Sequence, residues 1–298
     1  MLLALGYLIV IGAVLGGFMI AGGSPLLLMH PAEFIVIGGV AIGMLVVAAP
    51  QTVMTNLLKD IQACFKGSAT NKGEVIDLFK MLYELFVIGR RNGLIALDEH
   101  VSSPPTSSIF QKYPSFLHHK DRVDFLCSAL RPAIDGKVKP DQLKSLLEVE
   151  LDTKEDEAAQ SVMLLALVGD SLPGIGIVAA VLGIINTMAA IAEGPEKVGE
   201  RVAAALTGTF LGVLLAYGFV NPLGKRVAFN HREHFTYFRA MVQAIGGFAS
   251  GLSPAMAIET ARRALDTALQ PPGDELESAC KLAVSTKAPA AATPPPAK

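Results

Sequence analysis

Long stretches without a charged side chain constrain this chain more than any other feature. Lys, Arg, Asp and Glu are absent from residues 1–21, 34–49, 171–192 and 202–223. Three of these stretches reach about 20 residues, the length of helix that crosses the hydrocarbon core of a bilayer. The remaining stretch is shorter, but no charge follows it until Lys59. We therefore expect an all-α, polytopic membrane protein with four transmembrane helices.

The basic residues predict how these helices are oriented. All Lys and Arg except Lys197 and Arg201 lie in residues 51–167 and 224–298. Loops rich in Lys and Arg remain in the cytoplasm, whereas the short connection between the first two spans contains neither residue type. We therefore expect a large cytoplasmic loop between spans two and three, and both termini in the cytoplasm. Residues 1–21 lack the basic start of a signal peptide, so we interpret them as a retained first span.

The charge pattern divides the chain into five parts. The expected parts are a transmembrane hairpin at 1–50, a cytoplasmic helical domain at 51–167, a second hairpin at 168–223, cytoplasmic C-terminal helices at 224–284 and a disordered tail at 285–298. Three spans also carry small residues four apart, at Gly12 and Gly16, at Gly39 and Gly43, and at Gly208 and Gly212. This spacing lets helices approach closely in lipid, either within one subunit or between subunits.

The cytoplasmic segments read as helices. Apolar residues from Val75 to Phe86 recur at helical spacing, and Gly93 is a suitable C-terminal residue for that helix. Further helices are expected at 94–101, at 122–134, and from Pro140 without a break into span three. We also expect span four to continue as a helix towards Gly246, and a last helix to cover 253–269. The sequence contains no β pattern of any length.

Polar residues in or beside the spans are candidates for function, since they are costly in lipid. Asp170 stands at the start of span three, and Pro173 leaves the carbonyl of Gly169 without its usual helical donor. Pro222 closes span four. The other candidates are hydroxyl and amide side chains that either bond back to a carbonyl or line a hydrated seam: Asn186, Thr187, Thr207 and Thr209. No acidic residue lies deep within a span, so a conducted proton would need a carrier from a partner.

Other chemistry is not indicated. The chain has no phosphate-binding loop, no nucleophile motif and no metal-binding motif, so we expect neither an enzyme nor a cofactor nor a metal. Its net charge of −2 does not suggest a nucleic-acid partner. The cysteines, at 64, 127 and 280, lack metal-type spacing and are interpreted as reduced structural thiols. The histidines of the pair 118–119 and of the segment 231–234 are interpreted as surface residues.

Two long motifs carry a family resemblance. Residues 168–183, VGDSLPGIGIVAAVLG, resemble the third span of the flagellar stator branch of the MotA/TolQ/ExbB proton channel family. Residues 207–222, TGTFLGVLLAYGFVNP, are similar to its fourth span. The start of the chain, including Pro31 to Glu33, and the loop from Arg90 to Asp98 are similar as well. The resemblance covers nearly the whole chain apart from the last 20 or so residues.

The resemblance implies a function and partners. Proteins of this branch form a homo-pentamer in the bacterial inner membrane, among its lipids, around a dimer of MotB. MotB supplies the aspartate that binds the ion and anchors the complex to peptidoglycan. Ion flow, here more in the manner of the proton-driven branch than of the sodium-driven PomA branch, turns the ring, and its cytoplasmic loop pushes on the rotor protein FliG.

The resemblance also assigns roles to individual residues. Arg90 and Asp98 match rotor-contacting positions on either side of a turn, although the acidic position is usually Glu, which reaches one methylene further. Glu150 matches an acidic residue of the cytoplasmic loop. Pro173 and Pro222 match a pair of prolines tied to conformational coupling. The positions near the ion path are Asp170, Ala180 and Thr209.

Other functions remain as alternatives. An ExbB- or TolQ-like energiser of an outer-membrane system would share spans three and four, but such relatives have three spans and place the loop differently. A solute transporter would need inverted repeats and polar midplane residues from both halves, and a membrane enzyme would need a nucleophile or metal set. The sequence shows neither.

Overall fold

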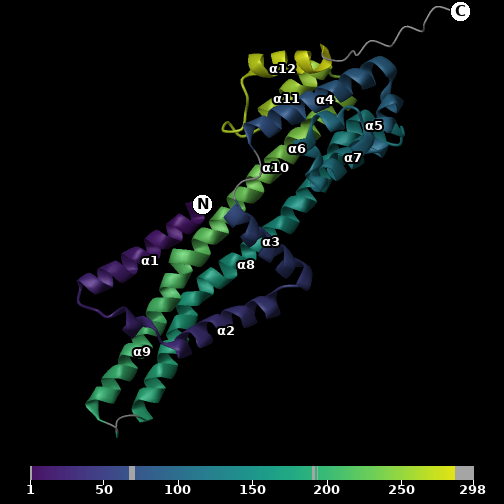
Figure 1. The fold of residues 1–298 in the computed structure, drawn as a ribbon. Coiled ribbons are helices and arrows are strands. Elements are labelled where there is room, and N and C mark those ends of the chain that lie inside the picture. Colours follow the sequence, from purple (N-terminus) through teal and green to yellow (C-terminus); the bar gives the residue numbers. More distant parts are fainter. Residues whose placement is uncertain (1, 67–70, 190–191, 193, 286–298) are drawn as a thin grey trace, which may run out of the picture. The chain divides into compact units, whose positions relative to one another are not determined.

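The computed structural model describes residues 2–66, 71–189, 192 and 194–285. These residues form helices and their connections, and no strand occurs among them. Four helical segments are long and apolar enough to cross a membrane: Leu2–Ile20, Pro25–Ala48, Pro140–Met188 and Pro195–Ala249 (Figure 1). The prediction of an all-α chain with four transmembrane helices is confirmed.

Two compact units make up the chain. Unit 1 contains Met1–Ser68 and Glu155–His231, and unit 2 contains Ala69–Lys154 and Arg232–Lys298. Segments of the expected cytoplasmic parts, 51–68, 155–167 and 224–231, thus cluster with the apolar helices. The division between membrane and cytoplasm at the residues given above stays a prediction. Of the expected tail, Ser285 is the last residue of a helix, and 286–298 lie outside the described residues.

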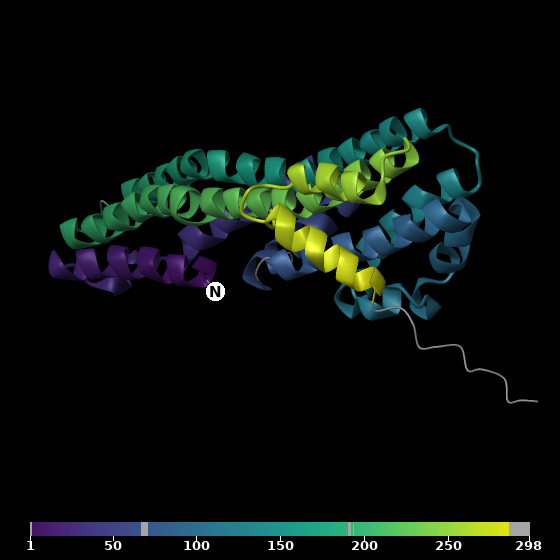
Figure 2. The ribbon, with the colours of Figure 1, turned by 90° about the horizontal axis from the view of Figure 1, so that it is seen from above.

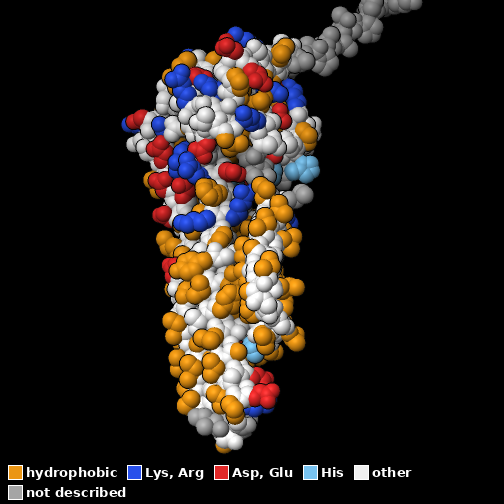
Figure 3. All heavy atoms as spheres, turned by 90° about the vertical axis from the view of Figure 1, so that its left-hand side faces the viewer, with side chains coloured by type: hydrophobic (Ala, Val, Ile, Leu, Met, Phe, Trp, Pro, Cys, Tyr) orange, Lys and Arg blue, Asp and Glu red, His pale blue; other side chains and the backbone are white. Residues whose placement is uncertain are grey.

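Unit 1 is built mostly from apolar helices, together with one amphipathic helix. They are α1 (Leu2–Ile20), the short turn η1 (Pro25–Leu28), α2 (Pro31–Ala48), α3 (Gln51–Lys66), the apolar part of α8 (Pro140–Ala189), α9 (Pro195–Leu214), the π-helical turn η6 (Leu215–Val220) and the start of α10 (Asn221–Ala249). Pro31 and Pro195 occupy first-turn positions, where a missing N–H costs nothing. Apolar side chains cover its surface (Figure 3), and Val47 is 89% exposed, as expected of residues facing lipid.

The long helices agree with the sequence. Helix α8 runs from Pro140 to Ala189 as one element, with Pro173 inside it, and contributes residues to both units. Helices α9 and α10 are joined by η6, which widens the helix for one turn just before Pro222. Figures 1 and 2 show α8 side by side with the consecutive helices α9 and α10. A π-helical turn is a frequent feature of functional sites in helices.

Unit 2 packs around α4 (Lys72–Asn92). Asn71 caps this helix by accepting a hydrogen bond from the N–H of Glu74 (2.9 Å). The expected apolar stripe from Val75 to Phe86 is buried, and Gly93 ends the helix with a positive φ of 84°. The elements around it are η2 (Leu94–Leu97), α5 (Asp98–Ser102), η3 (Pro104–Thr106), η4 (Phe110–Lys112), α6 (Pro114–Leu117), α7 (Lys120–Ile134), α11 (Pro254–Arg263) and α12 (Gly273–Ser285). Charged side chains gather on the surface of this unit (Figure 3).

The C-terminal helices differ from the prediction of one helix over 253–269. Helix α11 ends at Arg263, and a second helix, α12, follows after a turn. The side-chain amide of Gln270 donates to the carbonyl of Arg262 (3.1 Å), which reverses the chain at the end of α11. Pro271 and Pro272 then prevent a helix from resuming until Gly273. The single-helix expectation is therefore wrong at its C-terminal end.

Candidate functional site

Helices α8 and α9 meet through small residues whose backbones touch. A Cβ atom placed on Gly212 would lie 2.6 Å from the carbonyl oxygen of Leu172 and 2.8 Å from the Cα of Gly176. One placed on Gly183 would lie 2.8 Å from the Cβ of Ala205. These distances leave no room for larger side chains. We call this contact the α8–α9 seam, comprising Gly176, Gly183, Ala205, Gly208 and Gly212.

The seam decides between the two interpretations of the small-residue spacing. Gly208 and Gly212 pack against α8 of the same chain, so their spacing serves contact within one subunit. The glycines of spans one and two behave differently. A Cβ placed on Gly12, Gly16 or Gly39 would meet nothing within 4 Å.

The seam brings together two of the predicted ion-path residues. The Cα of Thr209 lies 3.3 Å from a Cβ placed on Gly176, and the backbone nitrogen of Ala180 lies 3.2 Å from one placed on Gly208. Ala180 is buried, and Thr209 is partly exposed on the face beside the seam. Their common position gives the seam one small apolar group and one hydroxyl-bearing residue on adjacent helices.

Two of the other candidates, Thr187 and Thr207, are tied to their own helices, and the backbone of Asn186 is bonded to the neighbouring helix. The hydroxyl of Thr207 donates to the carbonyl of Ala203, and that of Thr187 donates to the carbonyl of Gly183 (both 2.9 Å). The carbonyl of Asn186 accepts a hydrogen bond from Arg201 (2.8 Å). Back-bonding is therefore what the structure shows for the two threonines.

The segments that carry the two predicted coupling prolines touch at one contact, between Gly169 and Asn221. Pro173 leaves the carbonyl of Gly169 without its helical donor, and the side chain of Asn221 occupies the space where Gly169 lacks a Cβ atom. A Cβ placed there would lie 1.8 Å from Asn221 Oδ1. Asn221 directly precedes Pro222, so the turn around Pro173 and the start of α10 share one contact. Asp170, next to Gly169, is exposed on the surface of α8.

A buried carboxylate, which the sequence analysis did not select, lies against the seam. Glu33 is only 6% exposed, and its Oε2 lies 2.6 Å from a Cβ placed on Gly208. Among the described residues, this oxygen has no hydrogen-bond partner. Glu33 falls just outside the charge-free stretch of span two, which is why it was passed over. One signal could have found it: Glu33 is the only Lys, Arg, Asp or Glu before Lys59.

The predicted rotor-contact residues sit at two places in unit 2. Arg90 is exposed in the last turn of α4, and Asp98 is exposed at the first position of α5, on the other side of the Gly93 turn. The hydroxyl of Ser102 donates to Asp98 Oδ1 (2.9 Å). Between them, Ile95 is 79% exposed, an apolar side chain among charges. Glu150 belongs to α8 and lies 3.8 Å from Lys154 Nζ.

The turn is held from beneath by close packing. Gly89 lies under Phe248 and Leu97, whose side chains would be 3.0 Å and 3.2 Å from a Cβ at that position. Phe248 in turn stacks on Phe86, with ring centroids 4.3 Å apart. The charged side chains of the turn therefore project from a rigid base.

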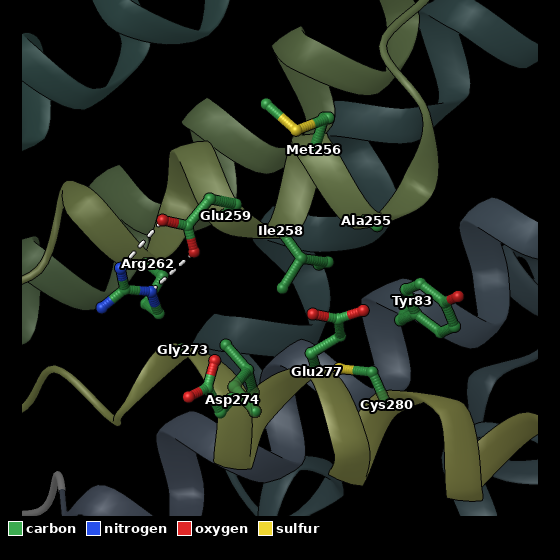
Figure 4. Close-up of a pocket in the computed structure, with 11 residues that line it drawn as sticks. Tyr83, Ala255, Met256, Ile258, Glu259, Arg262, Gly273, Asp274, Glu277 and Cys280 are labelled. Atoms are coloured by element: carbon green, nitrogen blue, oxygen red, sulfur yellow. Dashed lines mark hydrogen bonds and ion pairs between the residues drawn. The ribbon is translucent and has the colours of Figure 1, made fainter.

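Unit 2 also contains a cavity of about 500 Å³ between α4, α11 and α12 (Figure 4). In its wall, Arg262 donates two hydrogen bonds, of 2.7 and 2.8 Å, to the carboxylate of Glu259 on the same helix. The hydrogen bonds from Arg262 and Arg263 lower the pKa of Glu259 to about 2. On α12, Glu277 accepts from Lys281. Glu259, Arg262 and Glu277 are thus each engaged in an ion pair. The cavity was not foreseen because the sequence did not predict α12 as a separate helix.

The cysteines are free thiols in the structure. Burial raises the pKa of Cys127 to about 11 and that of Cys280 to about 12. The segment 231–234 departs from its interpretation as surface, because the His231 side chain is 19% exposed and lies 3.1 Å from Asp60. No group of three His, Cys, Asp or Glu suited to a metal ion occurs among the residues that the structure describes.

Comparisons with known proteins agree over most of the chain. Residues 4–93 match the family model of the motility protein A N-terminal region, and residues 118–240 match that of the MotA/TolQ/ExbB proton channel family. Motility protein A of Salmonella typhimurium is 36% identical, and that of Escherichia coli 35%, each over 93% of this chain and 94% of the relative. The solved structure of C. jejuni MotAB covers 91% of this chain and 97% of its own, with a TM-score of 0.74 and 22% identity.

Proposed function

The chain belongs to the MotA/TolQ/ExbB proton channel family, and from this premise we propose that it is a stator subunit of the bacterial flagellar motor. The observation that carries the proposal is the match to motility protein A over 93% of the chain, including the N-terminal region. The resemblance places such a subunit in the inner membrane with both termini in the cytoplasm. It would act in a homo-oligomer, by the resemblance a pentamer, around a MotB-type partner.

We propose that the partner carries the proton and this chain supplies the wall. A carboxylate on the partner would face the α8–α9 seam, where Ala180 and Thr209 lie on adjacent helices. Thr209 is partly exposed beside the seam, so its hydroxyl would offer a hydrogen bond to the carrier or to water. Lipid-facing apolar side chains elsewhere in unit 1 would prevent leakage.

Conversion of ion flow into movement would use the two prolines. Protonation of the partner changes the charge beside α8 and α9, and a charge change next to packed helices biases them between two arrangements. Pro173 and η6 are places where the backbone can yield, since each interrupts the regular helical hydrogen bonds. Asn221, lying against Gly169, would move both sites together. Asp170 would stand at the exit of the path.

The charged turn of unit 2 would contact the rotor protein FliG. Arg90 and Asp98 present opposite charges from a rigid base, and Ile95 adds an exposed apolar contact between them. Glu150 would add a further acidic contact from α8. Exposed charge pairs contribute little binding energy but set orientation and on-rate, which suits an interface that must be made and broken at each step.

The test is rotation in a motile strain that lacks its own stator pair. This chain would be co-expressed with the MotB-like protein of its genome, while sodium is varied at fixed pH and a protonophore is then added. Swimming that ignores sodium and stops with the protonophore supports a proton-driven stator. Swimming that follows sodium would move the chain to the PomA-type branch. Absence of motion with both proteins in the membrane contradicts the proposal.

The rotor contact has its own test. Torque should fall when Arg90→Glu and Asp98→Lys are combined, and should recover when opposite charges are exchanged on the rotor. Lys137→Glu is the matched control, since Lys137 is an exposed basic residue of the same unit, paired only with its neighbour Asp135 in the contacts shown. Normal torque from the double variant would rule out the charged contact.

An outer-membrane energiser of the ExbB/TolQ type is the competing function, because the match at residues 118–240 is to a family model that names those proteins. Purification of the tagged chain from its own membranes separates the two. A MotB-like protein in the purified complex supports the stator, whereas an ExbD- or TolR-like protein supports the energiser.

A further inference from the structure

Glu33 is buried in an apolar setting without a partner, although it lies in the first turn of a membrane helix. Its side chain reaches the α8–α9 seam, where Oε2 meets the backbone of Gly208 close to Ala179 and the nitrogen of Ala180. Nothing in the proposed function uses this residue. We propose that Glu33, with His30 beside it, is a proton-binding site on the outer part of the ion path.

The first step of the argument is the cost of a buried charge. An ionised carboxylate without hydrogen-bond donors or a counter-charge is strongly unfavourable in a low-dielectric site. Oε2 of Glu33 has less than 1 Å² of exposed area and no partner among the described residues. Protonation of Oε2 would remove this cost, so the site is suited to bind one proton.

The second step is that the chain makes room for this acid. Only glycine at position 208 leaves room for the carboxyl group, because a Cβ atom there would lie 2.6 Å from Glu33 Oε2. The Glu33 carboxyl group and the backbone nitrogen of Ala180 lie at the same point of α9, one residue before Thr209. Glu33 thus lies beside the two residues that the proposed ion path already uses.

The third step is a neighbour that can deliver a proton. His30 is the residue before Pro31 at the start of α2, and its Nε2 is likewise buried without a partner among the described residues. His30 and Glu33 interact electrostatically. His30 Nε2 and Glu33 Oε2 are not hydrogen-bonded to each other, so a proton would pass between them through an intervening water molecule.

The ligand is a proton rather than a metal cation. Hard cations require several oxygen ligands at once. Among the residues that the structure describes, Glu33 belongs to no group of three His, Cys, Asp or Glu that could hold a metal ion. Charged groups of α9 lie near His30. Glu200 interacts electrostatically with His30, and also with Lys197 and Arg201. Glu200 pairs with Lys197 at 2.9 Å.

The role rests on the proposed function, because it assumes that protons pass along the seam. The N-terminal ends of α2 and α9 would face the compartment opposite the cytoplasm, as the distribution of Lys and Arg predicts. Protons arriving from that side would reach His30 first, then Glu33, and then the carrier supplied by the partner.

The test compares Glu33→Gln with Glu196→Gln. Glutamine keeps the shape and the neutral charge of the protonated acid but cannot exchange a proton, so a purely structural role would survive the substitution. Glu196 is an exposed carboxylate on α9 and serves as the control. Proton flux is measured in cells that co-express the chain with its MotB-like partner. Glu33→Gln should lower the flux by at least about tenfold, since a positioned acid–base group typically contributes more than that. Glu33→Asp should restore part of it.

A second readout separates this inference from the stator proposal. The infrared spectrum of the purified complex should contain a C=O band of a protonated carboxylic acid at neutral pH, which Glu33→Gln removes and Glu196→Gln keeps. If the wild-type complex conducts no protons but the band is present, the stator proposal fails and the proton site stands. Absence of the band, or wild-type flux from Glu33→Gln, overturns the proton site.

Discussion

Replacement of Gly212 by alanine probes the contact on which the membrane helices depend. The added Cβ would lie 2.6 Å from the carbonyl oxygen of Leu172, while ordinary contacts begin near 3.4 Å. The distance is about 0.8 Å too short. The two nearest atoms, the carbonyl oxygen of Leu172 and the Cα of Gly176, belong to the backbone and cannot rotate away. The helices must therefore separate by a comparable distance along the seam.

The magnitude follows from the lost contacts. A gap of 0.5–1 Å forfeits a quarter to a half of the attraction of each atom pair, and each pair contributes about 0.1–0.2 kcal/mol. For roughly 20 atom pairs along the seam the loss is about 1 kcal/mol. Overpacking strain adds on the order of 1–3 kcal/mol, so the sum is about 2–4 kcal/mol. With about 2–4 °C per kcal/mol, we expect the unfolding midpoint to fall by about 4–16 °C.

The assay is thermal unfolding of the purified protein in detergent, followed by circular dichroism. Gly199→Ala is the matched control, because it lies on the same helix and a Cβ there meets nothing within 4 Å. It should leave the midpoint unchanged or raise it, since alanine favours helix over glycine. If Gly212→Ala were as stable as the control, the close approach of α8 and α9 would be refuted.

Three further predictions concern other sites. Asn221→Ala should leave the protein folded but about 1–2 kcal/mol less stable, because it removes the side chain packed against Gly169, and thermal unfolding measures this. At pH 8 the buried thiol of Cys127, with a pKa of about 11 against the ordinary 9.0, should hold about a hundredfold less thiolate, so maleimide should label it only after denaturation; Cys280 should react more slowly still. Glu259 has a pKa of about 2 when folded against the ordinary 4.5, so its stabilising effect is present above pH 4.5 and is lost as pH falls towards 2. Acid titration of Glu259→Gln, followed by circular dichroism, should lack that loss of stability, which solvent screening limits to less than about 1 kcal/mol.

The sequence predicts the helices where local signals agree. In α4 the apolar spacing, the basic last turn and Gly93 all point to the same helix, and the structure has it at Lys72–Asn92. The start of α8 at Pro140 and its passage through Pro173 follow from the absence of any other helix breaker. Each of these features depends on residues within a few positions of one another, which is why a single sequence reveals them.

Features that depend on contacts between distant segments could not be predicted this way. Arg122 looks like a surface residue of α7, yet it is 1% exposed, pairs with Glu74 at 2.7 Å and lies over the ring of Tyr237. These three residues come from α7, α4 and α10. Burial of an arginine becomes favourable only when such partners converge, and no pattern along one helix announces that they will.

The candidate site shows the same division. Gly208 and Gly212 indicate close packing, but the spacing alone does not say against what, and only the three-dimensional contacts with Gly176 and Leu172 assign it to α8.

The contact between Gly169 and Asn221 combines local sequence signals with a contact between distant segments. Pro173 predicts a free carbonyl at Gly169, and Pro222 predicts a change of backbone at the start of α10, but each is a local statement. The structure adds that Asn221 fits only because Gly169 has no side chain. A movement that shifts the start of α10 must therefore displace Asn221 from the turn that Pro173 has already weakened. We therefore expect the effect of replacing either proline to depend on whether Asn221 is present.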